Sequence, residues 1–361
     1  MENKTAQIAI NGFGRIGRAS FKIALEKGLN VVAINDIANP RVLAHLLKYD
    51  TAYGVYDKDV WLEEDGKIVR LEENDGGKEF FNIKGTENFI VVDGKKTAMF
   101  SDKDPANLPW GDLGVDVVLE CTGKFTKDDA ALVHISSGAK KVVVSAPVKG
   151  GTIQTFMMGV NDSQYLGQNA ISNASCTTNC ISPVLAIIDS NFKILKAGMS
   201  TIHAVTANQN VVDSPPFGEK VDMRRARAAG YNIVPTTTGA ADATGDVLPN
   251  LKGKFDGTSL RVPIITGSIV DITALLEKNV TKEEVNKVFE GAAKDPKYMN
   301  VIKATYEPLV SSDIIGDPHS AIVDLSMTTV IDGNMLKIFA WYDNEWGYSC
   351  RLVDMAIMMV S

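Results

Sequence analysis

One cysteine stands where a thiol could act as a nucleophile. Cys176 lies in the run Ser-Asn-Ala-Ser-Cys-Thr-Thr-Asn-Cys at residues 172–180, directly before an apolar segment, 181–188, that we interpret as a helix. At a helix N-terminus, unpaired backbone N–H groups and the positive end of the dipole favour the thiolate, which is the nucleophilic form. The same N–H groups can hold an oxyanion that forms on a substrate carbonyl.

A buried structural cysteine is the alternative, because that is the usual fate of a lone thiol. The neighbours of Cys176 argue against it, since their hydroxyls and amides would have to enter a core; they are Ser175, Thr177, Thr178 and Asn179. Pro183 complicates the helix, because proline removes one helical hydrogen bond. We therefore expect the helix to kink at Pro183 or to begin late.

A nucleophilic thiol needs a base, and the chain has 4 histidines: His45, His134, His203 and His319. His203 lies in an apolar stretch with alternation that indicates a strand, where a histidine is more often structural than catalytic. The residues alone leave the choice among the four histidines open.

A second constellation, near the start of the chain, predicts a dinucleotide site. A short apolar strand at 7–10 runs into G-x-G-x-x-G and then into a helical pattern that reaches residue 26. Gly12 permits the tight turn, Gly14 lets a pyrophosphate approach the backbone, and Gly17 lets helix and strand pack closely. The phosphates would rest on the helix N-terminus.

The next strand, at 31–34, ends in Asn35-Asp36. Asp36 stands where an acid would bind the ribose hydroxyls and repel the 2′-phosphate of NADP. The order of these elements favours NAD binding over a plain structural turn: a strand, the glycines, a helix and a second strand that ends in an acid.

Composition excludes several classes of protein. A chain of 361 residues predicts two domains with sizeable cores, and 45% apolar with 22% charged residues is ordinary for a soluble globular protein. We expect no secretory signal in the polar start and no membrane span. A net charge of −7 argues against nucleic acid as the primary partner. Four cysteines without framework spacing indicate a reducing compartment, so we expect a cytoplasmic protein.

No metal site is expected. Cys176 and Cys180 lie one helical turn apart, but a metal would need two further ligands and none is nearby in the sequence. An anionic substrate would instead need basic residues. Arg261 interrupts an apolar strand and needs an anionic partner. A second group of arginines lies at Arg224, Arg225 and Arg227, and three arginines on one helical turn usually form a solvated face.

The elements around these residues predict an α/β fold. Strand candidates at 115–120, 142–145 and 170–172 suit a parallel, Rossmann-type sheet with crossover helices. Between residues 57 and 100, turn signals predict hairpins; they are Asp65-Gly66, Asp75-Gly76-Gly77 and Asp93-Gly94.

After Cys176 the pattern changes to longer alternating strands, which predict an α+β domain with a mixed, mostly antiparallel sheet. They lie at 197–206, 260–275, 322–330 and 335–341. Thr281 begins a capping box that starts one of the helices. An apolar helix at about 348–360 ends the chain.

These motifs together resemble one family, the phosphorylating glyceraldehyde-3-phosphate dehydrogenases. The matching blocks occur in the family's order and cover essentially the whole chain, at 10–18, 172–180, 224–229, 260–263 and 341–348. The resemblance implies an NAD-binding domain at 1–175, a catalytic domain at 176–344, and a C-terminal helix at about 345–361 that returns to the first domain. It also implies a homotetramer.

The resemblance implies a glycolytic oxidoreductase that converts D-glyceraldehyde 3-phosphate and inorganic phosphate to 1,3-bisphosphoglycerate as NAD is reduced. The substrate would pass through a thiohemiacetal and a thioester on Cys176, with His203 as its partner. Two phosphate pockets would be formed by Ser175, Thr177, Thr206, Arg225, Thr238, Gly239 and Arg261. The implied cofactor contacts are Gly12, Gly14, Arg15, Ile16, Gly17, Asp36, Lys103, Thr122, Ser145, Asn344 and Tyr348.

Two other functions compete with this one. The related erythrose-4-phosphate dehydrogenases share the segment around Cys176. Thr206 and Thr238-Gly239, as phosphate donors, nevertheless favour glyceraldehyde-3-phosphate dehydrogenase. A non-catalytic surface or RNA-binding role is disfavoured by the intact Cys176 and His203. Ser214 stands where NAD-dependent members often have leucine, which weakens the case for NAD alone.

Overall fold

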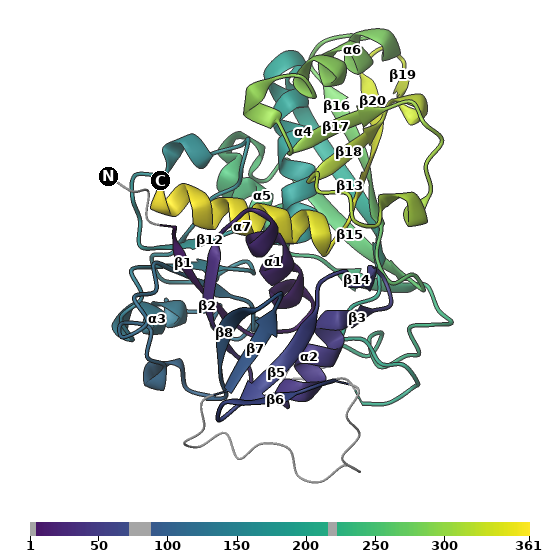
Figure 1. Ribbon diagram of the computed structural model, residues 1–361. Helices are drawn as coiled ribbons and strands as arrows, with labels where there is room; N and C mark the ends of the chain where they lie inside the picture. Colours follow the sequence, from purple (N-terminus) through teal and green to yellow (C-terminus); the bar gives the residue numbers. More distant parts are fainter. Residues whose placement is uncertain (1–4, 72–87, 216–221) are drawn as a thin grey trace. The chain divides into compact units, whose positions relative to one another are not determined.

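The computed structural model describes residues 5–71, 88–215 and 222–361 (Figure 1). The predicted turn Asp75-Gly76-Gly77 lies outside these ranges, as do Pro216 and Phe217 of the loop at 208–222 that carries Ser214. The chain forms two compact units, one of residues 1–154, 166–173 and 352–361, the other of residues 155–165 and 174–351. The predicted domain boundary at residue 175 stays a prediction.

The first unit contains the predicted Rossmann-type sheet. Its central strands lie in the order β12, β10, β9, β1, β2 and pair in parallel. Apolar runs such as Ile8-Ala9-Ile10 are fully buried, as expected for a sheet covered on both faces. The bounds are β1 Gln7–Asn11, β2 Asn30–Asn35, β9 Val117–Glu120, β10 Lys141–Val144 and β12 Ala170–Ser172.

One edge of this sheet is antiparallel. Beyond β2 the order continues β8, β7, β5, β6, with β8 parallel to β2 and the other pairs antiparallel. The predicted turns at Asp65-Gly66 and Asp93-Gly94 are confirmed, because both aspartates adopt positive φ between paired strands. The bounds are β5 Val60–Glu64, β6 Lys67–Val69, β7 Asn88–Val92 and β8 Lys95–Phe100; a small separate pair is β3 Tyr49–Asp50 with β4 Gly54–Val55.

Two helices of the first unit begin at a local sequence feature. Helix α1 (Arg15–Glu26) follows the glycine turn, and α2 (Pro40–Lys48) begins where the Asn39 side chain accepts from the N–H groups of Arg41 and Val42. The short α3 (Val133–Ser136) buries His134. The C-terminal end of the last helix, α7 (Trp346–Val360), also belongs to this unit, where Asp354 pairs with Lys27.

The second unit contains the mixed, mostly antiparallel sheet. Its order is β14, β15, β13, β16, β20, β18, β17, and β19 pairs with β20. The bounds are β13 Ile194–Ala204, β14 Val234–Thr237, β15 Phe255–Val262, β16 Ser268–Leu276, β17 Ile302–Thr305, β18 Ala321–Asp324, β19 Thr329–Ile331 and β20 Met335–Tyr342.

Two predicted strands were wrong in extent. The stretch 260–275 is divided between β15 and β16, because the chain turns at Gly267. The φ of +90° at this position suits glycine, and a Cβ added there would lie 2.2 Å from the Ser311 carbonyl oxygen. The stretch 322–330 is divided by a 3₁₀ turn at Leu325–Met327, which begins where the Asp324 carboxylate accepts from Ser326 N–H. Alternation alone does not detect either turn.

Helices α4 (Cys176–Phe192), α5 (Ala240–Val247) and α6 (Lys282–Ala292) belong to this unit (Figure 1). The predicted capping box is confirmed at Thr281, whose side chain accepts from Glu284 N–H while the Glu284 side chain accepts from Thr281 N–H. Residues of α4 such as Ile181 and Ile188 pack with Ile272 and Ile338 of the sheet in one apolar core.

Within the described residues, no helix combines the length and apolar character that a membrane span requires. Over the same part of the chain, no group of three or more histidine, cysteine or acidic side chains is arranged to hold a metal ion.

Candidate active site

The candidate nucleophile is the first residue of helix α4. Ser175 is the N-cap, and its hydroxyl oxygen accepts from Thr178 N–H at 3.2 Å. This bond fixes the helix start at Cys176 and leaves the first N–H groups of the helix without intrahelical partners. Of the two expected alternatives, a kink at Pro183 or a late start, the late start is wrong, because the helix begins before Pro183 and continues through it.

His203 is the histidine that faces this thiol. Its Nε2 lies 3.4 Å from Cys176 Sγ, and the side chain is 3% exposed on β13. The other three histidines have different surroundings: His45 is exposed on α2, His134 bonds to Glu120, and His319 bonds to Asp317. His203 is thus the histidine that lies beside Cys176, which supports the choice that the resemblance implied, and its role as the base stays a prediction.

Arg261 approaches the other side of the imidazole. It stands opposite His203 in the parallel register of β13 and β15, and its Nη1 lies 2.6 Å from His203 Nδ1 and 3.0 Å from the Ala204 carbonyl oxygen. Nδ1 also lies 2.7 Å from that oxygen. If Nδ1 accepts from Arg261, Nε2 carries the proton toward the sulfur; if Nδ1–H donates to Ala204, Nε2 is free to act as a base.

Burial opposes ionisation of both Cys176 and His203. Burial raises the pKa of the Cys176 thiol, and the Arg261 charge with hydrogen bonds from Thr177 and the Cys176 backbone acts in the opposite direction. Burial and the Arg261 charge lower the pKa of His203 to about 3. The helix position alone therefore does not ionise the thiol, and formation of a thiolate at neutral pH requires a proton acceptor.

Tyr342 supports this pair and was not predicted as a site residue. Its ring packs edge-on against the His203 imidazole, with centroids 5.9 Å apart. Its hydroxyl lies 3.0 Å from Thr177 Oγ1 and 2.9 Å from Thr201 Oγ1. Tyr342 thus joins β20 to the start of α4 and limits the freedom of the imidazole.

The predicted phosphate ligands are distributed over several elements. Arg225 pairs with Asp222 at 3.1 Å, and its charge helps to lower the pKa of Arg261, for which burial is the larger cause. The Thr206 hydroxyl donates to Asn208 at 2.7 Å, and Thr238 Oγ1 accepts from Ala240 N–H where Gly239 caps α5. Their phosphate contacts stay a prediction.

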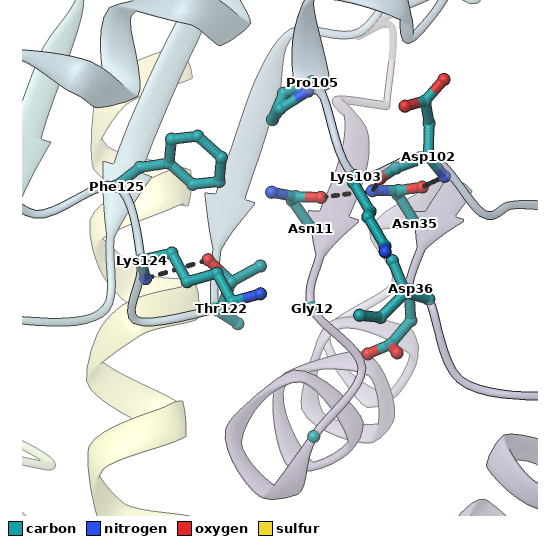
Figure 2. Close-up of a pocket in the computed structure, with 13 residues that line it drawn as sticks. Asn11, Gly12, Asn35, Asp36, Asp102, Lys103, Pro105, Thr122, Lys124 and Phe125 are labelled. Carbon is teal, nitrogen blue, oxygen red and sulfur yellow. Dashed lines mark hydrogen bonds between the residues drawn. The ribbon is translucent and has the colours of Figure 1, made fainter. Parts of the chain in front are cut away.

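A pocket in the first unit lies at the carboxyl ends of β1, β2 and β9 (Figure 2). Five predicted cofactor residues line it, namely Gly12, Gly14, Asp36, Lys103 and Thr122. Sequence reasoning missed the others, although several directly follow or end the same strands; they are Asn11, Asn35, Ile37, Asp102, Pro105, Cys121, Lys124 and Phe125.

The three glycines act as the motif predicts, each for its own reason. A Cβ on Gly12 would lie 2.7 Å from Thr122 N, and one on Gly17 would lie 2.1 Å from the Gly12 carbonyl oxygen. Gly14 has no atom within 4 Å of its Cβ position, so this space beside the N-terminus of α1 is open to a pyrophosphate. The pocket therefore fits a dinucleotide.

Asp36 is fixed at the pocket by backbone donors. Its Oδ2 accepts from Phe13 N–H at 2.6 Å and its Oδ1 from Ala38 N–H at 2.8 Å. The carboxylate thus links the end of β2 to the glycine turn and carries a negative charge in the pocket wall. That charge suits a ribose with free hydroxyls and opposes a 2′-phosphate.

Other predicted cofactor residues do not line this pocket. Arg15 pairs with Asp50 at 2.5 Å, Ser145 bonds to the Cys121 thiol, and Gly17 packs inside the turn; Ile16 is also absent from the wall. Their cofactor contacts stay a prediction. In the second unit, Tyr348 donates its hydroxyl to the Ala174 carbonyl oxygen at 3.0 Å.

Asn344 is oriented by two hydroxyls. Its Oδ1 accepts from Ser268 Oγ at 2.8 Å and from Thr266 Oγ1 at 3.3 Å. The Ser268 hydroxyl also accepts from Ala204 N–H at 3.1 Å, which ties Asn344 to the strand that carries His203. Because Oδ1 is used in this way, the Asn344 side chain presents its NH₂ group as the remaining donor.

Comparison with known proteins gives matches over both units. Residues 175–344 match the family described as "Glyceraldehyde 3-phosphate dehydrogenase, C-terminal domain", and residues 6–79 and 73–128 match "Glyceraldehyde 3-phosphate dehydrogenase, NAD binding domain". Two proteins named glyceraldehyde-3-phosphate dehydrogenase, from Streptomyces coelicolor and Borreliella burgdorferi, are each 48% identical to this chain over 98% of its length. The matches cover 98% of the Streptomyces protein and 99% of the Borreliella protein. Glyceraldehyde-3-phosphate dehydrogenase 2 of Bacillus subtilis is 46% identical over 97% of this chain and 95% of its own.

Proposed function

The chain belongs to the glyceraldehyde-3-phosphate dehydrogenase family, and from that premise we propose that it oxidises D-glyceraldehyde 3-phosphate to 1,3-bisphosphoglycerate with NAD and inorganic phosphate. The observation that carries the proposal is the thiol at the start of α4 facing His203 Nε2 at 3.4 Å. The dinucleotide pocket of the other unit supplies the cofactor requirement.

Cys176 and His203 account for the covalent steps. Cys176 Sγ adds to the aldehyde carbon as His203 Nε2 takes the thiol proton, and the imidazolium then returns that proton to the former carbonyl oxygen, which becomes the hydroxyl of a thiohemiacetal. His203 then takes the hydroxyl proton as the carbon is oxidised to the thioester. NAD, when bound, supplies the hydride acceptor for that oxidation. Phosphate attacks the thioester carbonyl, and the Cys176 sulfur leaves as thiolate.

The surroundings of the thiol suit the charges that form. The backbone N–H groups at the start of α4 can donate to the oxyanion of each tetrahedral species. Arg261 and Arg225 provide guanidinium groups for two phosphoryl groups, with hydroxyl or N–H donors from Ser175, Thr177, Thr206, Thr238 and Gly239. Asn344 would donate its NH₂ to the nicotinamide carboxamide, with Tyr348 beside it.

An NADH-formation assay with two aldehydes tests this function. We expect rapid NADH formation with glyceraldehyde 3-phosphate, much slower formation with erythrose 4-phosphate, and a strong requirement for inorganic phosphate with the first. A preference for erythrose 4-phosphate would instead assign the chain to the related reaction. NADH formation with neither aldehyde would contradict the proposal.

Cofactor choice gives a first prediction. Asp36→Ala should lower the preference for NAD over NADP, because the negative charge in the pocket wall is lost. We expect the ratio of the two kcat/KM values to fall about tenfold, equivalent to about 1.4 kcal/mol. Asp36→Asn is the matched variant, since it removes the charge but keeps an oxygen for the Phe13 N–H. An unchanged ratio in both variants would show that another segment, such as the loop with Ser214, sets cofactor choice.

Assembly gives a second prediction. Val211 and Val212 are 83% and 66% exposed in an irregular loop, which is unfavourable for apolar side chains in solvent. We propose that a homotetramer covers this loop. Light scattering at micromolar concentration should give four times the 39.0 kDa chain mass, and Val212→Glu should shift the distribution toward smaller species. A fully active monomer would contradict the proposal.

We also propose a cytoplasmic location, supported by a substrate and cofactor of central metabolism. Nucleic acid is not proposed as the primary partner, because the chain carries a net charge of −7.

A further inference from the structure

A buried acid stands at the end of a central strand of the first unit. Strands β2, β1 and β9 end at Asn35, Asn11 and Glu120, which are neighbours in the sheet register. Their side chains are 3%, 1% and 1% exposed. A buried carboxylate is unfavourable unless it is well hydrogen-bonded, and the thiol chemistry of the second unit does not use Glu120.

One chain of hydrogen bonds crosses the strand ends toward Glu120. Asp102 N–H donates to Asn35 Oδ1 at 2.9 Å, and Asn35 Nδ2 donates to Asn11 Oδ1 at 2.7 Å (Figure 2). Asn11 Nδ2 then donates to Glu120 Oε2 at 2.6 Å. Both amides therefore turn their NH₂ groups in the direction of Glu120.

A second chain reaches the same oxygen from the opposite side. Trp110 Nε1–H lies 3.1 Å from His134 Nδ1, and His134 Nε2 lies 2.9 Å from Glu120 Oε2. An indole N–H only donates, so Nδ1 accepts and Nε2 carries the proton that is donated to Glu120. Trp110 and His134 are both fully buried.

The other carboxylate oxygen holds the loop after β9. Thr122 N–H donates to Glu120 Oε1 at 2.7 Å, and the Thr122 hydroxyl donates to the same oxygen. Thr122 in turn lies against Gly12, where a Cβ would be 2.7 Å from Thr122 N. Glu120 does not line the dinucleotide pocket, but Asn11, Gly12 and Thr122 do.

We propose that Glu120 is a positioning residue for the dinucleotide. Its carboxylate is the common acceptor at which both chains end, and it holds the loops after β1 and β9 at the separation that the cofactor needs. These two strands lie where the chain's crossovers reverse direction, which is where α/β sheets bind such ligands. The inference rests on the proposed NAD-dependent function and adds a residue that no pocket contact would identify.

Glu120→Gln is a sharp test because it keeps the shape and removes an acceptor. If the new NH₂ group lies on the Oε2 side, it faces the N–H groups of Asn11 and His134. Relieving that conflict would require both asparagine amides to turn over, and Asn35 would then present NH₂ to Asp102 N–H. If it lies on the Oε1 side, it faces the two donors of Thr122. Either way the loops must move.

The experiment measures the Kd for NAD by titration calorimetry on apoprotein whose folding is verified by circular dichroism. We expect Glu120→Gln to raise the Kd at least tenfold, while kcat at saturating NAD and alkylation of Cys176 change less than threefold. Asp324→Asn is the matched control, because Asp324 is also buried and accepts from Ser326 N–H, but in the second unit. Its Kd should stay within twofold of the wild-type value.

A second pair of variants decides the matter if Glu120→Gln does not fold. His134→Gln keeps one donor for Glu120 and one acceptor for Trp110, whereas His134→Leu removes both. The Kd for NAD should rise at least threefold in His134→Leu and stay near the wild-type value in His134→Gln. A wild-type Kd in folded Glu120→Gln, or equal Kd values in the His134 pair, would overturn the proposal. Failure of the wild-type protein to bind NAD would instead overturn the proposed function.

Discussion

Replacing Cys176 by serine should lower kcat by at least about 10⁴-fold while leaving the Kd for NAD within twofold of the wild-type value. The serine hydroxyl keeps the position at the start of α4 but is far less ionised, and it forms an oxygen ester in place of a thioester. The cofactor pocket lies in the other unit and contains neither this residue nor its neighbours. Steady-state NADH formation and calorimetric NAD titration measure the two quantities.

Cys180→Ser is the matched control for that variant. Cys180 lies one turn further along α4, is fully buried, and contacts the Ala340 carbonyl oxygen at 3.9 Å without facing His203. It should retain most of the activity, with a modest loss of stability from a hydroxyl in an apolar core. Substantial turnover by pure Cys176→Ser protein would refute the role of Cys176 as nucleophile.

His203→Asn should lower kcat/KM by about 10² to 10⁴-fold, which is the usual contribution of a general base. It should also shift the pH dependence of Cys176 alkylation to higher pH. Burial raises the pKa of the thiol, so without a proton acceptor the thiolate forms only as the pH rises toward that raised value. With His203 present, the imidazole is neutral at neutral pH, because burial and the Arg261 charge lower its pKa to about 3. A neutral imidazole can hydrogen-bond the thiol proton and take it in the transition state as the sulfur attacks carbon.

Iodoacetamide inactivation followed from pH 5 to 10 measures this shift. His45→Asn serves as the control, because His45 is exposed on α2 in the other unit. Its alkylation profile should match that of the wild-type protein. An unchanged profile in His203→Asn would mean that the helix N-terminus and Arg261 activate the thiol without a base.

The sequence by itself determined the features that depend on neighbouring residues. The glycines at 12 and 17 specify the turn between β1 and α1 by local geometry, because Gly12 has a φ of +92° and a Cβ on Gly17 would lie 2.1 Å from the Gly12 carbonyl oxygen. Thr281 and Glu284 cap α6 through reciprocal bonds three residues apart. Ser175 likewise fixes Cys176 as the first residue of α4. Such short-range bonds leave a readable pattern in the chain.

The tertiary structure decided which distant side chains meet. Periodicity left four histidines as candidate bases. His203 faces Cys176 only because β13 passes the start of α4. The register of β13 with β15 then places Arg261 against His203. Periodicity also predicted one strand in place of β15 and β16, since the glycine at the turn between them is required by the close approach of Ser311, a residue distant in the sequence. Glu120 looked like the last residue of an ordinary strand. Its partners Asn11 and His134 come from other parts of the chain, and a hydrogen bond between sequence-distant residues is fixed by sheet order and register, which local propensity does not encode.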